Sequence, residues 1–317
     1  MELVALDPGY GFIKLATVRG AVVLPSAVAV PTGGAIRRRI AGLRVAKPPL
    51  EVITDQGRFF VGDGAHDWGV PIENLDFDRL TGSPEMRALL YAAFGKAQLS
   101  GEIRLIVGLP LEALATAEVV RAVKAFLQGR HAWQMNGQGW EVTVTRVSIT
   151  AQPVGGVFDY FLDDDGEPIP ERSADFKKEI GIVNVGMNTV DLLVVRDGTM
   201  VSRFTRGEKL GVRRLFELLN HEGLYSLTEL DERLRCGELD ISEATPIWAQ
   251  EVLGFIESKW GKAVKRFARV IAVGGGVVLL GHHLASLPRV WVPPEPVLAQ
   301  VRGLLKYALG KEKRQAA

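Results

Sequence analysis

The stretch LVALDPGYGFIKLATV at residues 3–18 contains two apolar runs separated by a turn with two glycines. The stretch GIVNVGMNTVDLLVV at residues 181–195 repeats this order in the middle of the chain. Each pattern predicts two neighbouring antiparallel strands joined by a tight turn. Because each hairpin opens its own half of the chain, we predict a duplicated α/β fold with a cleft between the two halves.

Composition fits this two-part organisation. The length of 317 residues, with 47% hydrophobic and 24% charged residues, suits two domains that each bury a core. The 38 basic and 37 acidic residues leave a net charge of +1, so we expect no direct nucleic-acid binding and no membrane partner. The single cysteine, Cys236, excludes an internal disulfide. Neither a signal peptide nor an apolar run of the ~20 residues that span a bilayer is found, so we expect a cytoplasmic protein.

Periodicity and capping signals predict further elements on either side of the hairpins. Strands are predicted at 21–30, 51–64 (as a hairpin), 103–109, 141–150, 199–204, 269–273 and 290–292. Helices are predicted at 84–97, 111–127, 152–162, 208–221, 226–235, 243–266 and 296–309. Residues 32–48, which include Arg37, Arg38 and Arg39, are glycine-rich and basic, so we expect a loop whose charges are solvated. The polar segment 163–178 predicts a surface loop near a domain boundary.

The first turn carries residues suited to a phosphate site. Gly9 and Gly11 let backbone N–H groups approach an anion without an intervening side chain. Asp7, at the end of the first strand, is suited to hold Mg²⁺ through water, and Lys14 is placed to reach a phosphate as a point charge. Taken alone, this turn is equally an ordinary hairpin.

The second turn offers a matching set. Gly186 permits close backbone approach, Asn188 and Thr189 offer side-chain donors, and Asp191 lies on the following strand. An ordinary hairpin explains this turn as well when it is taken alone. Finding one such turn in each half of the chain favours two walls of one phosphate site over two unrelated hairpins.

Two more segments favour a nucleotide site. Gly274, Gly275 and Gly276 stand between an apolar strand and a helix, where a flat or anionic group fits beside the backbone. A Rossmann motif is disfavoured because these glycines are consecutive and lack its spacing. Gln152 opens a helix after a strand, where a glutamine can position a water for attack on a γ-phosphate, although a plain helix start is the alternative.

The ordered set of motifs resembles a known superfamily. DPGYGFIK, AQPVGG, NVGMNTVD and VGGG are similar to the phosphate-1, connect, phosphate-2 and adenosine motifs of actin, sugar kinases and heat-shock chaperones. The finer resemblance is to ParM-type plasmid-segregation actins and other bacterial and archaeal actin-like proteins. It is carried by RLTGSPEMRALLYAA, LIVGLP, GEKLGVRRLFELL and PVLAQVRGLLKYALG.

This resemblance implies an actin-like (ribonuclease H-like, duplicated) fold of two domains with a nucleotide cleft between them. We expect domain I at 1–160 and domain II at 161–300, with 207–266 as a smaller subdomain and the helix 301–317 returning to domain I. It further implies an ATPase that binds ATP or GTP with Mg²⁺ and assembles into a homopolymer filament. In this family such filaments often move plasmid DNA through a DNA-binding adaptor protein.

The resemblance also implies roles for individual residues. Asp7 would lie near Mg²⁺ and Gln152 would be the hydrolytic residue, with Asn184 as the third catalytic position; Asp191 is a second candidate for the metal. The residues implied to contact the nucleotide are Gly9, Tyr10, Gly11, Lys14, Gly186, Asn188, Thr189, Gly211, Gly274, Gly275 and Gly276.

One position departs from the family pattern. Asn184 stands where the family usually has aspartate, and asparagine carries no charge and is a poor base. A slow ATPase with long-lived filaments is one outcome, and compensation by Asp191 is another. The alternatives for the whole chain are a non-polymerising kinase of the same superfamily and a hydrolysis-impaired assembly or regulatory module.

Overall fold

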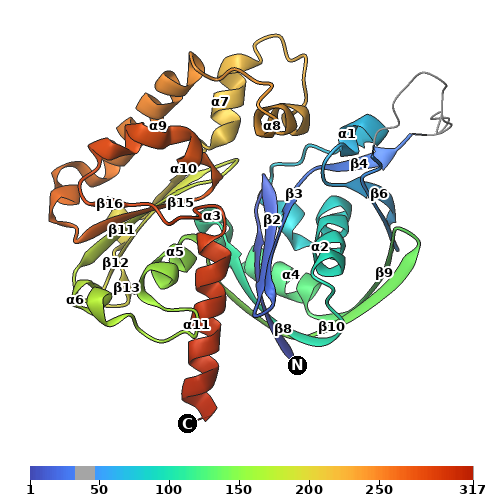
Figure 1. Ribbon diagram of the computed structural model, residues 1–317, viewed down its shortest axis with the longest axis horizontal. Coiled ribbons are helices and arrows are strands. Elements are labelled where there is room, and N and C mark those ends of the chain that lie inside the picture. The colour runs from blue at the N-terminus through green and yellow to red at the C-terminus, as the bar shows by residue number, and fades with distance from the viewer. Residues whose placement is uncertain (33–46, 317) are drawn as a thin grey trace.

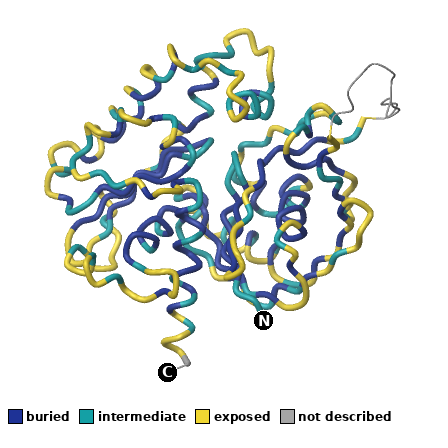
Figure 2. Tube along the Cα trace, in the orientation of Figure 1, coloured by how far each residue is buried: buried dark blue, intermediate teal, exposed yellow. Residues whose placement is uncertain are grey.

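The chain forms two lobes, each built around its own β-sheet. The computed structural model describes residues 1–32 and 47–316. Figure 1 shows the two sheets in separate halves of the molecule, with the last helix running between them. Figure 2 shows that buried backbone is concentrated on the sheets and on the helices against them, while exposed backbone lies mainly in the loops and outer helices. The duplicated α/β architecture is therefore confirmed.

The first sheet takes its strands from the first half of the chain. Its order is β3-β2-β1-β8-β10-β9-β5-β6-β4-β7. Strands β1 and β2 form the predicted hairpin, whereas β1, β8 and β10 run parallel. The bounds are β1 Glu2–Pro8, β2 Phe12–Thr17, β3 Gly20–Pro25, β4 Val28–Pro31, β5 Leu50–Thr54, β6 Gly57–Val61, β7 Gly69–Pro71, β8 Gly101–Leu109, β9 Gly129–Met135 and β10 Gln138–Ala151.

The second sheet repeats the opening of the first. Its order is β13-β12-β11-β15-β16, and β14 pairs with β12. The hairpin registers correspond, because Asp7 lies opposite Lys14 in the first sheet and Asn184 lies opposite Asp191 in the second. The bounds are β11 Glu179–Val185, β12 Val190–Arg196, β13 Thr199–Met200, β14 Arg206–Glu208, β15 Arg269–Val273 and β16 Val290–Trp291.

Helices cover both faces of each sheet. Helices α2 and α4 supply residues to the core on one face of the first sheet, and α7, α9 and α10 do so on the second. The α-helices are α1 Ala65–Trp68, α2 Pro84–Lys96, α3 Leu111–Leu114, α4 Ala117–Leu127, α5 Gln152–Phe161, α6 Ser173–Phe176, α7 Val212–Leu219, α8 Leu227–Arg235, α9 Ala244–Trp260, α10 Gly275–Leu280 and α11 Ala299–Ala316. Short 3-10 helices are η1 Phe77–Thr81, η2 Pro170–Arg172, η3 Ser202–Phe204, η4 Gly261–Arg266 and η5 Gly281–Ser286.

Helices α5 and α11 join the two lobes. Helix α5 shares a core with the second sheet, and α11 shares one with the first. The two helices cross so closely that a Cβ atom on Gly303 would lie 1.9 Å from the Gly155 carbonyl oxygen. Beside this crossing, the Arg302 guanidinium donates to both carboxylate oxygens of Asp159, at 2.7 and 2.8 Å. Because each helix packs on a different sheet, a movement of one lobe against the other would shift α5 against α11.

Several predicted elements have different bounds. The helix expected at 111–127 is interrupted between α3 and α4, and the strand expected at 21–30 is split into β3 and β4, which pair with different strands. The strand expected at 199–204 is reduced to β13, followed by η3. Helix α9 ends before Gly261, whose φ of 46° lies in the left-handed region that favours glycine. Most of the loop predicted at 32–48, including its three arginines, lies outside the described residues.

The helix crossing makes a prediction about stability. Gly303→Ala should destabilise the fold by about 1–3 kcal/mol, because its new methyl group would overlap the backbone of α5. Gly254→Ala in α9 is the matched control, since nothing lies within 4 Å of the added Cβ, and it should stabilise the helix by up to about 1 kcal/mol. Thermal unfolding of both variants measures these effects. If both variants changed the unfolding temperature by the same amount in the same direction, the tight helix crossing would be contradicted.

Candidate nucleotide site

The first hairpin places a buried ion pair beside its turn. The Asp7 carboxylate is only 1% exposed, and Lys14 on the opposite strand donates to its Oδ2 at 2.7 Å. Gln152, the first residue of α5, donates through Nε2 to the other oxygen of Asp7 at 2.9 Å. The same amide nitrogen lies 3.3 Å from Oε1 of Gln300 on α11. One carboxylate therefore fixes the hairpin to both interlobe helices.

The second hairpin repeats this geometry without a cation. Thr189 donates through its hydroxyl to Oδ2 of Asp191 at 3.1 Å, and the Asn184 amide nitrogen lies 3.5 Å from the same oxygen. Burial raises the pKa of Asp191 to about 6, although the hydrogen bonds from Thr189 and Asn184 act to lower it. The other amide atom, Asn184 Oδ1, is buried and has no partner in the described part of the chain. Asn184 Oδ1 is therefore available to accept a hydrogen bond from a ligand at this wall.

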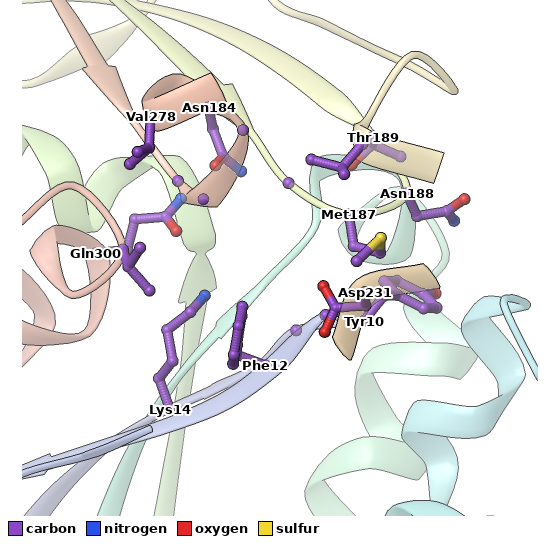
Figure 3. Close-up of a pocket in the computed structure, with 18 of the residues that line it drawn as sticks. Tyr10, Phe12, Lys14, Asn184, Met187, Asn188, Thr189, Asp231, Val278 and Gln300 are labelled. Carbon is purple, nitrogen blue, oxygen red and sulfur yellow. The ribbon is translucent and has the colours of Figure 1, made fainter. Parts of the chain in front are cut away.

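The two turns meet across the gap between the lobes. A Cβ atom on Gly11 would lie 3.1 Å from Cβ of Met187, which places the turns in direct contact. The Asn188 amide also reaches from the second turn to the Leu75 carbonyl oxygen in the first lobe, at 3.3 Å. Beside this contact lies a cavity of about 290 Å³ that both hairpins line, close to the smallest volumes typical of ligand sites. Figure 3 shows Lys14 and Phe12 on one side of this cavity and Asn184 and Val278 on the other.

The glycine run forms a third wall. Gly274 has a φ of 97°, and a Cβ atom there would lie 2.4 Å from the Val185 carbonyl oxygen and 2.8 Å from Asn184 Oδ1. A side chain at this position would displace the second hairpin, so glycine is required for the close approach. Gly275 and Gly276 follow at the start of α10 and also line the cavity.

Most of the residues predicted for the site share this cavity. Those that line it are Gly9, Tyr10, Gly11, Lys14, Gln152, Asn184, Gly186, Asn188, Thr189, Gly274, Gly275 and Gly276. Asp7 and Asp191 are held behind these residues, and neither belongs to the lining. Gly211 is also outside it; its backbone N–H donates to the Asn188 carbonyl at 3.2 Å, and the next residue, Val212, lines the cavity.

The remaining lining residues were not identified from the sequence. They are Phe12, Pro110, Met187, Val212, Asp231, Leu234, Arg235, Val278, Leu279, Val297 and Gln300. Phe12 and Met187 lie inside the quoted hairpins and could have been inferred from position. Asp231, Leu234 and Arg235 belong to α8, and their place depends on how that helix folds back toward the first lobe, for which the local sequence carries no signal.

Helix α8 contacts the first lobe near the mouth of the cavity. Arg235 donates to Asp63 at 2.6 Å and to Asp231, one turn earlier on α8, at 3.0 Å. Glu232 accepts a hydrogen bond from the Gly64 backbone N–H at 2.8 Å. Figure 1 shows α8 at the edge of the second lobe that faces α1 and β4. Polar contacts, several of which are partly exposed, thus join α8 to the first lobe beside the cavity.

The wall chemistry fits a nucleotide with Mg²⁺. Asn184 Oδ1 and Gln300 Nε2 are a buried acceptor and a buried donor without partners in the described residues, and both side chains line the cavity. Within residues 1–32 and 47–316, no group of three or more His, Cys, Asp or Glu side chains could hold a metal ion. A magnesium ion here would need oxygen ligands from a bound phosphate, which is its usual coordination in nucleotide sites.

The pKa of Asp191 makes a prediction. Its folded pKa of about 6 exceeds its ordinary value of 3.8, so the neutral carboxyl contributes stability below about pH 4, and this contribution is lost as pH rises through 6. The free energy of unfolding of Asp191→Asn, relative to that of wild type, should therefore rise by up to about 3 kcal/mol between pH 4 and pH 7. Urea unfolding of wild type and of Asp191→Asn across this pH range measures this difference. A difference in unfolding free energy that does not change with pH would contradict a buried, shifted Asp191.

Comparisons with known proteins agree with this geometry. Residues 5–155 match the family model described as Actin like proteins N terminal domain. No curated protein sequence matches the chain. In the described part of the chain, no helix is long and apolar enough to cross a membrane.

Solved structures match over nearly the full chain. The archaeal actin homolog Ta0583 has a TM-score of 0.75 at 20% identity, covering 99% of this chain and 100% of that one. Its complex with ADP gives a TM-score of 0.73 at 21% identity, with the same coverage. A 15-stranded ParM filament from Clostridium botulinum gives 0.73 at 18% identity, covering 98% of this chain and 99% of that one. The predicted resemblance is confirmed: residues 5–155 match the N-terminal domain of actin-like proteins, and the chain has the actin-like fold.

Proposed function

We propose that the chain binds ATP or GTP with Mg²⁺ in the cleft between its lobes, hydrolyses it and assembles into filaments of its own copies. The observation that carries this proposal is the single cavity lined by both glycine hairpins and by the Gly274–Gly276 run. Backbone groups in glycine turns and the Lys14 ammonium suit a phosphate chain. The domains proposed are 1–160 with 301–317, and 161–300.

The chain's own residues would prepare the reaction as follows. Lys14 would contribute positive charge beside the phosphates while Asp7 holds its position. Gln152 would orient the attacking water, since its side chain lies at the cavity wall and is fixed by Asp7. Asp7, through water, and Asn184, through its free Oδ1, would help to hold a magnesium ion, which would supply positive charge beside the phosphates. Asp191 is the weaker candidate for the metal, because burial raises its pKa to about 6 and so favours the neutral carboxyl.

Asn184 favours a slow hydrolase. Its register partner is Asp191, so an aspartate here would face a second buried carboxylate, and the two could not both ionise at low cost. Asparagine avoids this repulsion but supplies neither the charge nor the basicity of a carboxylate. The same observation supports a second candidate function, a hydrolysis-impaired assembly module that binds nucleotide and polymerises without turnover.

Filament formation is proposed from the comparisons. One of the similar structures is a ParM filament and another is an Alp12 filament, each at less than 25% identity. Because the interlobe helices are the connection through which the lobes can move, nucleotide state would alter subunit contacts by a hinge motion. We further propose a role in plasmid or DNA segregation, with a DNA-binding adaptor as partner, in the cytoplasm where ATP and magnesium are available.

Pelleting with ATP or GTP and Mg²⁺, paired with phosphate release, tests the proposal. Wild type should pellet and release phosphate. Gln152→Ala should pellet and bind nucleotide but release phosphate at least about 100-fold more slowly, because its water is no longer positioned. Gln56→Ala, at an exposed turn that does not line the cavity, is the control and should behave as wild type.

Other outcomes separate the alternatives. Pelleting without phosphate release in wild type would favour the assembly module. Phosphate release that requires an added metabolite and occurs without pelleting would favour a kinase of the same superfamily. Unchanged phosphate release in Gln152→Ala would overturn the assigned role of Gln152, and absence of any nucleotide binding would overturn the proposed function.

A further inference from the structure

Arg79 is a buried cation behind the first hairpin. It belongs to η1, is 4% exposed and does not line the nucleotide cavity. Its guanidinium lies over the Tyr10 ring at 4.5 Å from the ring centroid. Together with Ser26 it lines a separate small cavity of about 40 Å³, of which Tyr10 and Gly11 are also part. The first turn is therefore a wall between the nucleotide cavity and Arg79.

The hydrogen bonds of Arg79 hold the turn in one orientation. Its Nη2 donates to the Gly9 carbonyl at 3.2 Å, and the Ser26 hydroxyl donates to the same oxygen at 2.7 Å. In a planar trans peptide the carbonyl and the next N–H point in opposite directions. The Tyr10 N–H therefore points away from Arg79. The bonds from Arg79 and Ser26 keep the Gly9 carbonyl oxygen, an acceptor, from turning toward a bound anion. The Tyr10 N–H, a donor, is left on the side of the turn opposite Arg79.

The charge of Arg79 is not neutralised by a contacting carboxylate. Within the described residues it takes part in no ion pair, and its second guanidinium bond goes to the Asn74 carbonyl at 3.3 Å. The nearby carboxylate of Glu85 is instead held by the Asn74 amide at 2.9 Å. Burial lowers the pKa of Arg79, yet an arginine stays charged in proteins. Lys14 differs, because Asp7 already neutralises it at 2.7 Å.

A buried cation is costly unless negative charge lies near it. Glu85 supplies part of that charge without contacting Arg79, and an anion bound on the other side of the turn that Arg79 supports would supply more. We infer that Arg79 is a positioning residue for the phosphate chain, which fixes the Gly9–Gly11 turn and supplies the positive charge that Lys14, paired with Asp7, does not supply in full. This inference rests on the proposed nucleotide site and adds a residue that does not touch the ligand.

The test compares ligands of different charge. Arg79→Met keeps an unbranched apolar side chain but removes the charge and the bonds to the Gly9 and Asn74 carbonyls. The affinity for a non-hydrolysable ATP analogue should fall about 10- to 100-fold, the usual effect of losing a hydrogen bond to a charged group. The loss should be smaller for ADP and smallest for AMP. A residue with a merely structural role would weaken all three by the same factor.

Two further variants complete the experiment. Arg121→Met removes one exposed positive charge from the same lobe, where Arg121 pairs with Glu118, and should leave all three affinities unchanged. Arg79→Lys retains the charge but lacks the planar fork that reaches both carbonyls, so it should lose less affinity for the ATP analogue than Arg79→Met. If Arg79→Met does not fold, Arg79→Lys replaces it in the test. A loss of affinity that is equal for all three nucleotides in Arg79→Lys would then overturn the inference.

The failure of this inference is distinguishable from that of the proposed function. Binding in wild type with equal losses, or no loss, across the three nucleotides in Arg79→Met overturns the role of Arg79 alone. Absence of binding by wild type to any of the three overturns the nucleotide site and the inference together.

Discussion

The cleft depends on one buried carboxylate, that of Asp7. Its two oxygens accept from Lys14 and Gln152, so the first hairpin, the start of α5 and, through Gln300, the helix α11 are joined at one point. An isolated charge at 1% exposure would be unstable without such partners. Because α5 packs on the second sheet and α11 on the first, the same carboxylate connects the phosphate turn to the two helices that link the lobes.

The duplication explains why the second hairpin differs. Asn184 and Asp191 occupy the register positions that Asp7 and Lys14 occupy in the first hairpin. A carboxylate and an ammonium neutralise each other, whereas a carboxylate opposite Asp191 would not. With asparagine the pair carries at most one charge, and burial raises the pKa of that one carboxyl to about 6. The departure from the family pattern is thus consistent with the local electrostatics of this chain.

Local signals predicted the walls of the cleft well. The two hairpins and the Gly274–Gly276 run are short, and glycine between two strands or at a helix start is itself a sequence signal. The close contact of Gly9 is with Phe12 in its own turn, whereas those of Gly274 and Gly276 are with Val185 of the second hairpin and could not be inferred locally. Gln152 could be placed because proline and a preceding strand mark the start of α5. The resemblance then supplied the order of the motifs, which the individual patterns could not.

Features made by tertiary contact could not be predicted in this way. The contact of Arg235 with Asp63 joins residues 172 positions apart, and nothing in either segment specifies it. Arg79 lies in a short 3-10 helix whose sequence does not indicate a buried cation. Its burial results from packing against the Tyr10 ring of the first turn. Strand β9 was missed because one of its three buried positions is His131, which weakens the alternation of apolar and polar residues in the sequence.

The central claim is that one ligand is held from both walls by the two hairpins. Hydrogen–deuterium exchange on the wild-type chain, kept below the concentration at which it pellets, tests this most directly. Adding a non-hydrolysable ATP analogue with Mg²⁺ should slow exchange in peptides covering residues 8–14 and 185–190 together, and leave the outer part of α9 unchanged. Slower exchange in only one hairpin, or in neither while the analogue binds, would contradict the account.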